Sequence, residues 1–349
     1  MLMMIKNTEE TILKNASLEE KVAFLKQPAA YFHSVNKVEA RETHMSWIFF
    51  AGDFVYKLKK PGKCRFLDHR TIESRLKDCD REIKLNKKLA ADIYIGLEPL
   101  TKNKEGGLQL NEDGPVEEWL VKMKRVPEEA MLDNAIKNNN VNKARLKQAA
   151  ELLINFYKQA SPVLMNENEY RKKLEKEIVY NHKALLHKAF KFPVPVIEKV
   201  SRTLIDFLKK QSSLFDERVS NKKIIEGHGD LRPEHVCLLP KPAIIDRLEF
   251  SRALRILDMA EELSFFAMEC EILGNDKPAE IFFDAYTKQT SDNIHQLLIL
   301  FYKIKKACLR AYLSARHITE QNYNPHDKWL AKANAYIQLA ERYERKISK

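Results

Sequence analysis

The stretch His228-Gly-Asp-Leu-Arg-Pro-Glu-His-Val236 carries the strongest signal for fold and chemistry in this sequence of 349 residues. A second segment, Ile244-Ile-Asp246, follows after a Pro-Lys-Pro turn, so Asp230 and Asp246 each lie beside an apolar, strand-like run. Phosphoryl transfer needs such a pair of carboxylates: one orients and deprotonates the attacking hydroxyl, and the other holds the Mg²⁺ that neutralises nucleotide phosphates. The pair therefore favours a phosphoryl-transfer site.

The polar residues of the first stretch have distinct predicted roles. Asp230 is the candidate catalytic base, and Arg232 is placed to face the transferring phosphate. His235 comes five residues after Asp230, where a second metal ligand is expected, and Asp246 is the predicted magnesium ligand. An ordinary capped turn is the alternative for a lone His-Gly-Asp. The second aspartate at hairpin spacing favours the catalytic interpretation.

The first third of the sequence offers an independent test, because phosphate binding in kinases uses a strand lysine held by a helix glutamate. Lys57 and Lys59 fall on one face of a predicted strand, since strand side chains alternate. Glu82 borders the apolar stripe of the next predicted helix and is expected to point inward. Taken singly, the lysines read as solvated side chains. Their order ahead of Glu82 and of the His-Gly-Asp loop favours a kinase-like arrangement.

The secondary-structure pattern changes near residue 126. Residues 1–42 are predicted to be helical and then irregular, with a capping-box pattern at Ser17-Leu-Glu-Glu20. A long helix is predicted over 68–90. Strands are expected at 46–50 and 54–58, joined as a hairpin through Ala51-Gly-Asp53, and at 94–100, 108–110 and 118–125.

Helices dominate from residue 141 onward, interrupted over 224–250 by two short strands. The predicted fold is α+β and bilobal, of the protein-kinase-like type: a small β-rich N-lobe with one long helix, then a larger helical C-lobe. We expect domains at 1–125 and 126–349, the first binding nucleotide. The predicted helices cover 142–160, 166–190, 195–211, 251–273, 277–288, 291–318 and 327–347.

Composition narrows the choice of partners. The net charge is +11, compatible with nucleic acid, an anionic surface or an anionic substrate such as ATP. The lysines and arginines are mostly mixed with acids along helices, and no nucleic-acid-binding motif is present, so solvated helix faces explain most of them. No apolar run approaches the ~18 residues of a membrane span.

Cysteine usage and the N-terminus bear on location. The five cysteines are dispersed and form no C-x-x-C pair, so neither a disulfide framework nor a zinc site is expected. Met1-Leu-Met-Met-Ile-Lys6 lacks the basic region and apolar length of a signal peptide. A reducing cytoplasmic location is therefore expected.

Several segments together resemble the aminoglycoside-phosphotransferase-like kinases, and within them a bacterial branch of unknown substrate. The resemblance runs from about residue 40 to about residue 315. It is carried by Glu42-Thr-His-Met-Ser-Trp-Ile-Phe-Phe50, Val55-Tyr-Lys-Leu-Lys-Lys-Pro61, Arg81-Glu-Ile-Lys-Leu-Asn86, His228-Gly-Asp-Leu-Arg-Pro-Glu-His235, Ile245-Asp-Arg-Leu-Glu-Phe250, Leu254-Arg-Ile-Leu-Asp258 and Glu262-Leu-Ser-Phe265.

The resemblance implies an ATP-dependent kinase that uses Mg²⁺ and phosphorylates a hydroxyl of a small molecule. Asp230 would be the base and Asp246 the metal ligand. Lys57, with Lys59 as the alternative, would contact the phosphates beside Glu82. The strand ending near Met123 would form the hinge next to the adenine.

Two departures from that family leave an alternative open. His235 stands where relatives typically have asparagine, and imidazole suits Mn²⁺ better than Mg²⁺, so manganese is an alternative metal. No G-x-G-x-x-G loop exists, and no glycine precedes Gly52. A catalytically weak or inactive pseudokinase that binds nucleotide or a partner is the second hypothesis. A nucleic-acid binder, which rests on charge alone, is the third.

Overall fold

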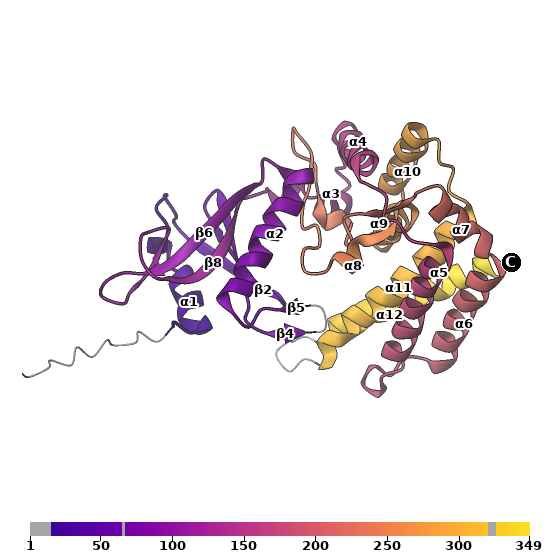
Figure 1. The fold of residues 1–349 in the computed structure, drawn as a ribbon, viewed down its shortest axis with the longest axis horizontal. Helices are drawn as coiled ribbons and strands as arrows, with labels where there is room; N and C mark the ends of the chain where they lie inside the picture. The colour runs from indigo at the N-terminus through magenta and orange to yellow at the C-terminus, as the bar shows by residue number, and fades with distance from the viewer. Residues whose placement is uncertain (1–14, 65–66, 320–325) are drawn as a thin grey trace, which may run out of the picture. The chain divides into compact units, whose positions relative to one another are not determined.

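The computed structural model describes residues 15–64, 67–319 and 326–349. The chain divides into two compact units, Met1–Arg125 and Val126–Lys349 (Figure 1). The N-terminal segment 1–6, expected to lack a signal peptide, lies outside the described residues.

Unit 1 is built on a six-stranded sheet in the order β1-β2-β3-β8-β6-β7, with every neighbouring pair antiparallel. The strands are β1 (Val38–Glu42), β2 (Ser46–Ala51), β3 (Phe54–Lys59), β6 (Tyr94–Lys102), β7 (Leu108–Leu110) and β8 (Val116–Lys124), with a separate short pair β4 (Lys63–Cys64) and β5 (Leu67–Asp68). The helical elements are α1 (Leu18–Leu25), the 3-10 turn η1 (Pro28–Ala30) and α2 (Ile72–Ala90).

Local sequence explains most of these elements. Ser17 caps α1 and forms the full capping box with Glu20, as predicted. The β2–β3 hairpin turns at Gly52, whose φ of +59° suits a residue without a Cβ. Strand β1 was not predicted, because only Val38 and Ala40 of its five residues are apolar and only the face that carries them is partly buried.

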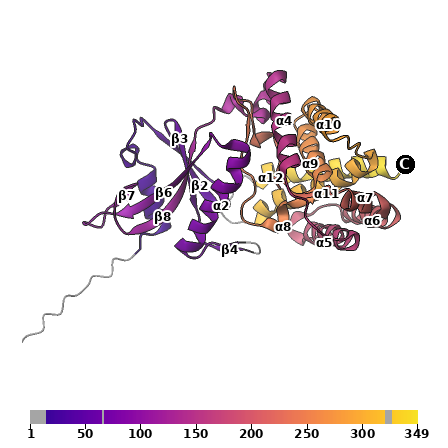
Figure 2. The same cartoon turned by 45° about the horizontal axis from the view of Figure 1, so that its top comes forward.

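The two faces of the unit 1 sheet differ. One face packs its apolar core against α1 and η1, using residues that include Phe49, Tyr56 and Leu58. Helix α2 packs against β6 and β8 of the sheet, which Figure 2 shows from a second direction. Because side chains alternate along a strand, Lys57 and Lys59 point away from the Tyr56 and Leu58 face.

Unit 2 is mostly helical. Its helices are α3 (Leu132–Lys137), α4 (Lys143–Gln159), α5 (Glu167–Leu185), α6 (Val194–Lys210), α7 (Ser212–Ser220), α8 (Arg252–Arg255), α9 (Met259–Ile272), α10 (Lys277–Thr290), α11 (Gln296–Thr319) and α12 (His326–Ile347). The short elements are η2 (Glu128–Ala130), η3 (Lys188–Phe190), η4 (Pro233–His235), β9 (Ile224–Glu226), β10 (Val236–Cys237), β11 (Ala243–Ile244) and β12 (Ile256–Asp258).

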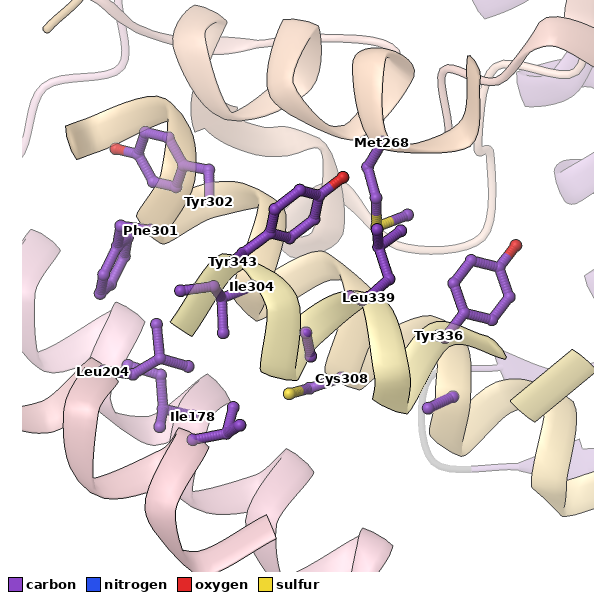
Figure 3. Close-up of a cluster of buried hydrophobic side chains, with 14 of the residues drawn as sticks. Ile178, Leu204, Met268, Phe301, Tyr302, Ile304, Cys308, Tyr336, Leu339 and Tyr343 are labelled. Atoms are coloured by element: carbon purple, nitrogen blue, oxygen red, sulfur yellow. The ribbon is translucent and has the colours of Figure 1, made fainter. Parts of the chain in front are cut away.

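The core of unit 2 gathers around the packed helices α11 and α12. Figure 3 shows side chains of this core, among them Phe301 and Cys308 together with Leu204 and Ile178. Tyr336 lies at the edge of the cluster drawn there, with its hydroxyl pointing away from the other labelled side chains. The apolar faces of these helices give unit 2 a rigid base for the loops described below.

Two helix predictions in unit 2 need correction. The predicted helix 251–273 is broken into α8, β12 and α9, because Ile256–Asp258 pairs antiparallel with β9. Helices α3 and α7 were not predicted as separate elements, and α7 follows α6 almost directly. Tertiary strand pairing overrides a local helical pattern in the first case.

Two further expectations can be compared with the described residues. No helix among them is long and apolar enough to cross a membrane. Cys79, Cys237, Cys270 and Cys308 are buried free thiols, and none of these four forms a disulfide.

Candidate active-site residues of the two units

In unit 1, both predicted strand lysines contact the predicted helix glutamate. Lys57 Nζ lies 2.8 Å from Glu82 Oε1, and Lys59 Nζ lies 2.7 Å from Glu82 Oε2. The Glu82 side chain is fully buried, Lys59 is 1% exposed and Lys57 is 14% exposed. Glu82 therefore fixes two cations on one face of the sheet, and Lys57 is the one that water or a ligand reaches more easily.

Met123 shares that face of the sheet. It lies opposite Val55 in the β3–β8 register, and Lys57 lies opposite Val121. Directly opposed residues of an antiparallel pair point the same way, and residues two apart share a face. Met123 thus projects on the Lys57 side, at the end of β8, just before the boundary between the two units.

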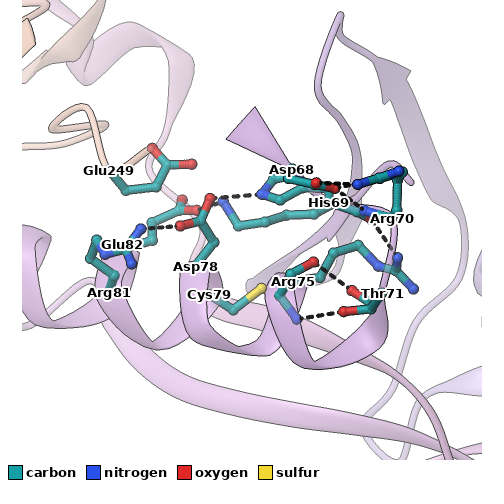
Figure 4. Close-up of polar contacts among 12 residues, drawn as sticks. Asp68, His69, Arg70, Thr71, Arg75, Asp78, Cys79, Arg81, Glu82 and Glu249 are labelled. Atoms are coloured by element: carbon teal, nitrogen blue, oxygen red, sulfur yellow. Dashed lines mark hydrogen bonds and ion pairs between the residues drawn. The ribbon is translucent and has the colours of Figure 1, made fainter. Parts of the chain in front are cut away.

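A polar network holds helix α2 in place (Figure 4). His69 Nε2 lies 2.7 Å from Asp78 Oδ2, and Asp78 also contacts Arg81. Arg75 binds Glu118 of β8 and donates to the His69 carbonyl. Burial works to raise the pKa of Asp78, but the hydrogen bond from His69 and the charge of Lys59 lower it below its usual value. The network fixes the helix that carries Glu82.

In unit 2, backbone hydrogen bonds join the His-Gly-Asp loop to the Asp246 segment. The His228 ring donates through Nε2 to the Ile245 carbonyl at 2.9 Å, and the Leu248 N–H donates to the His228 carbonyl at 3.1 Å. The Ile245 N–H donates to the His235 carbonyl at 2.9 Å. Burial lowers the pKa of His228 to about 3, so this ring is neutral. The two aspartate segments are therefore held together at several points.

The Asp230 carboxylate is partly exposed, and one of its oxygens, Oδ2, is hydrogen-bonded to Arg232. Arg232 donates to Asp230 Oδ2 through Nη2 at 2.9 Å and through Nε at 3.1 Å. The Asp230 side chain is 29% exposed. Burial works to raise the pKa of the Asp230 carboxyl, and the charges of Arg232 and Arg310 outweigh it, so the pKa lies below its usual value. Asp230 is therefore ionised at neutral pH and able to accept a proton.

His235 and Asp246 lie close enough to share a ligand. His235 Nδ1 donates to the Asp230 carbonyl at 2.7 Å, since a carbonyl oxygen only accepts. This fixes the neutral tautomer with a lone pair on Nε2, which accepts from Arg232 at 3.1 Å and lies 3.5 Å from Asp246 Oδ2. Asp246 has a left-handed φ of +60°, and its side chain is 46% exposed. A backbone carbonyl on the second ring nitrogen is typical of metal-binding histidines.

Glu262 holds the backbone of the His-Gly-Asp loop in place, a role that the sequence did not predict. Its carboxylate accepts the backbone N–H groups of His228 at 3.0 Å and Gly229 at 2.6 Å, and the Tyr157 hydroxyl at 2.8 Å. Burial raises the pKa of Glu262. A Cβ on Gly227 would lie 2.8 Å from a Glu262 oxygen, so any larger residue there would displace this carboxylate. Asp258 caps α9, the helix that carries Glu262.

Arg247 and Arg255 tie the Asp246 segment to strand β9. Arg247 donates to the carbonyls of Gly227 and Glu226, at 2.9 and 2.8 Å. Arg255 donates to the Leu248 carbonyl and pairs with the Glu226 carboxylate at 2.7 Å. The signal that would have identified such residues is a charge inside a buried segment, as for Glu262 within the apolar run of α9.

The sequence-predicted site residues thus form two groups. The structure brings Lys57, Lys59 and Glu82 into contact in unit 1, with Met123 on the same face of the sheet. It brings Asp230, Arg232, His235 and Asp246 together in unit 2, as the preceding contacts describe. Among the described residues, no cluster of three or more His, Cys, Asp or Glu side chains is suited to hold a metal ion.

Comparison with known sequences gives relatives without an assigned activity. Uncharacterized proteins of Mycobacterium tuberculosis and Mycobacterium bovis are 30% identical to this chain over 278 residues. The match covers 78% of this chain and 54% of those proteins, so the chain spans about half the length of the curated relatives it matches. No protein-family model matches the sequence.

Comparison with solved structures identifies the fold. Choline kinase LicA from Streptococcus pneumoniae superposes with a TM-score of 0.53 at 15% identity, covering 93% of this chain and 100% of that chain. A choline/ethanolamine kinase family protein from Mesorhizobium loti gives 0.51 at 14% identity, covering 94% and 99%. LicA in complex with AMP gives 0.51 at 17% identity, covering 94% and 100%. The predicted α+β, kinase-like fold is confirmed.

Proposed function

We propose that this chain is an ATP-dependent phosphotransferase that transfers the γ-phosphate to a hydroxyl of a small-molecule acceptor. The observation that carries the proposal is the joining of the Asp230 loop to the Asp246 segment by three hydrogen bonds, His228 to Ile245, Leu248 to His228 and Ile245 to His235. A kinase-like fold that holds two carboxylates in this way has the base and the metal ligand that phosphoryl transfer requires.

Asp230 acts as the base. Arg232 holds its Oδ2, and no hydrogen bond to Oδ1 exists within the described part of the chain, so Oδ1 is able to accept the proton of the acceptor hydroxyl. The hydroxyl oxygen forms the new bond to the γ-phosphorus as the bond to the β,γ-bridging oxygen breaks, and ADP leaves. Positioning and charge stabilisation supply most of the rate enhancement, because the protein performs little covalent chemistry.

Asp246 and His235 are the residues proposed to hold a divalent metal. One carboxylate and one imidazole nitrogen, 3.5 Å apart, fit a site that takes its other ligands from nucleotide phosphate and water, with the metal replacing Arg232 at His235 Nε2. When bound, the metal would neutralise the charge of the phosphates. The nitrogen ligand favours Mn²⁺ over Mg²⁺ as the better-tolerated ion, although both belong to the proposal.

Unit 1 supplies the proposed nucleotide contacts. Lys57 is the proposed phosphate ligand, because it is more exposed than Lys59 while sharing the same glutamate. Lys59 is a positioning residue that helps fix Glu82. Met123 is proposed to lie next to the adenine. Binding of a nucleotide is supported by the fold shared with LicA, which has been solved with AMP.

A pseudokinase that binds nucleotide or a partner without turnover is the second candidate. It is favoured by the β2–β3 connection, which is a tight turn at Gly52 and not a Gly-rich loop over phosphates. It is also favoured by Arg232, which pairs with the proposed base. Action in the cytoplasm is a further proposal, supported by the four buried free thiols.

The test measures ADP formation with MgATP and with MnATP across a panel of hydroxyl-bearing small molecules. Wild-type protein and an Asp230→Asn variant are compared, and nucleotide binding is followed in parallel by thermal shift. The proposal expects turnover to fall by roughly 100-fold or more in the variant while nucleotide binding is kept. Full turnover in the variant would contradict the role of Asp230. Binding without turnover in wild type would support the pseudokinase.

A further inference from the structure

A second charged group lies beside the candidate base in unit 2. Arg310 of α11 pairs with Glu269 of α9 at 2.9 Å, and Glu269 also accepts the Tyr336 hydroxyl at 2.9 Å. The Arg310 guanidinium lies over the Tyr336 ring, 5.5 Å from its centroid. Its positive charge contributes to the lowered pKa of Asp230, so this side chain acts on the candidate base through space.

Lys332 belongs to the surface that Arg310, Glu269 and Tyr336 form. It lies four residues before Tyr336 on α12, so the two side chains share one face of that helix. Burial lowers the pKa of Lys332, as do the charges of Arg310 and Arg232, while Glu269 and Glu234 work in the opposite direction. Lys332 therefore lies within electrostatic reach of both the Arg310 group and the Asp230 loop.

The carboxylates of this surface are already paired, and Lys332 is not. Arg232 contacts both Asp230 and Glu234, and Arg310 holds Glu269. Within the described ranges, no carboxylate lies at ion-pair distance from Lys332, and its ammonium lies 5.9 Å from the centroid of the Trp329 ring. The lysine is partly buried. A partly buried ammonium that no carboxylate contacts directly is costly, and a bound anion at contact distance would reduce that cost.

We propose that Lys332, supported by Arg310, binds an anionic group of the phosphoryl acceptor, either a carboxylate or a phosphate monoester. The acceptor is then a hydroxy acid or a phosphorylated alcohol and not a cationic amino alcohol. The inference rests on the proposed function, since it assigns the acceptor class of the same site. It places the anionic end of the acceptor on α12 and its hydroxyl near Asp230.

The full chain is tested with five probes that carry a hydroxyl but differ in charge: glycerol, glycerate, glycerol 3-phosphate, ethanolamine and choline. ADP formation is measured with each, and calorimetry measures their binding with and without a non-hydrolysable ATP analogue. The variants are Lys332→Met, Lys332→Arg and, as a matched control, Lys328→Met, which removes an exposed lysine one turn earlier on α12.

Glycerate or glycerol 3-phosphate is expected to bind better than the neutral and cationic probes. Lys332→Met should weaken that binding, and raise the KM for that probe, by roughly tenfold or more, with the KM for ATP unchanged. Lys332→Arg should restore most of the affinity, and Lys328→Met should behave as wild type. The difference between glycerate and glycerol 3-phosphate then decides between carboxylate and phosphate.

Three results would overturn the proposal: preference for choline or ethanolamine, anion binding that does not respond to Lys332→Met, or a loss confined to the KM for ATP. The last would mean that Lys332 acts on the nucleotide. If the phosphotransferase proposal failed and the Lys332 proposal held, the measurements would give another pattern. No probe would then be turned over, while Lys332-dependent binding of an anionic probe would persist.

Discussion

At the residue scale, one carboxylate in each unit organises its neighbours. Glu82 binds two lysines through its two oxygens, and Glu262 accepts two loop N–H groups and a tyrosine hydroxyl. Both side chains are almost fully buried. A buried carboxylate persists only with enough partners to offset its lost hydration, so these contacts define where the functional side chains lie.

Replacing the two lysines of β3 one at a time is expected to affect different properties, ATP binding for Lys57 and stability of the fold for Lys59. Lys57→Ala should weaken ATP binding by roughly tenfold, because the more exposed lysine is the proposed phosphate ligand. Lys59→Ala should lower the free energy of unfolding by about 3 kcal/mol, because it breaks a buried ion pair. Calorimetric ATP titration and chemical denaturation measure the two effects. Lys84→Ala, which removes a lysine with a 73% exposed side chain on α2, is the control. If Lys59→Ala weakened ATP binding and Lys57→Ala lowered the free energy of unfolding, Lys59 would be the phosphate ligand and Lys57 the positioning residue.

His235 is expected to set the metal preference. Replacing it by asparagine offers an oxygen ligand, so His235→Asn should raise the ratio of kcat/KM with Mg²⁺ to that with Mn²⁺ by roughly tenfold. Steady-state kinetics with each metal provide the measurement. His187→Asn, a change at the exposed residue that precedes the turn η3, is the control. An unchanged ratio would remove His235 from the metal site.

At the element scale, the site depends on short strands and loops that the sequence indicated only in part. The β2–β3 hairpin, helix α2 and the capping box of α1 follow local rules of alternation, helical spacing and capping, and were predictable. The pairing of β9 with β12 was not, since it joins segments about thirty residues apart and replaces a predicted helix. The roles of Glu262 and Arg247 emerged only with that tertiary arrangement.

The His228 ring joins the two aspartate segments by donating to the Ile245 carbonyl, and its pKa makes the stability of the fold depend on pH. Its pKa of about 3 in the folded chain lies below the ~6.5 of an unfolded histidine. Between these values the unfolded state binds the proton first, so stability is lost as the pH falls. From about pH 7 to about pH 5, this group should remove about 2 kcal/mol from the free energy of unfolding.

Denaturation of wild type and His228→Gln at both pH values measures that loss. The variant lacks the titrating ring, so its stability deficit relative to wild type should narrow by about 2 kcal/mol at the lower pH. His187→Gln, at the exposed residue that precedes the turn η3, should show no such narrowing. If the free energy of unfolding changed equally with pH in wild type and His228→Gln, the His228 ring would not be held neutral in the folded chain.

At the scale of the whole molecule, the kinase-like fold was predictable from the sequence and the acceptor was not. The order of lysine strand, glutamate helix and His-Gly-Asp loop is enough to indicate the fold, which the choline kinase LicA structures share at 15–17% identity. The acceptor surface has no motif, because Arg310, Glu269 and Lys332 come from three helices and meet only in the folded unit. Charge pairing in three dimensions, and not spacing in sequence, singles out Lys332.

The central claim is that the paired loops of Asp230 and Asp246 form a metal–nucleotide site. The most direct measurement is a crystal structure with a non-hydrolysable ATP analogue and Mn²⁺, using anomalous scattering to locate the metal. The account predicts a manganese peak at coordination distance from the Asp246 carboxylate, with the γ-phosphate of the analogue near Asp230. A bound analogue whose manganese lies away from Asp246, or the absence of any manganese peak there, would contradict it.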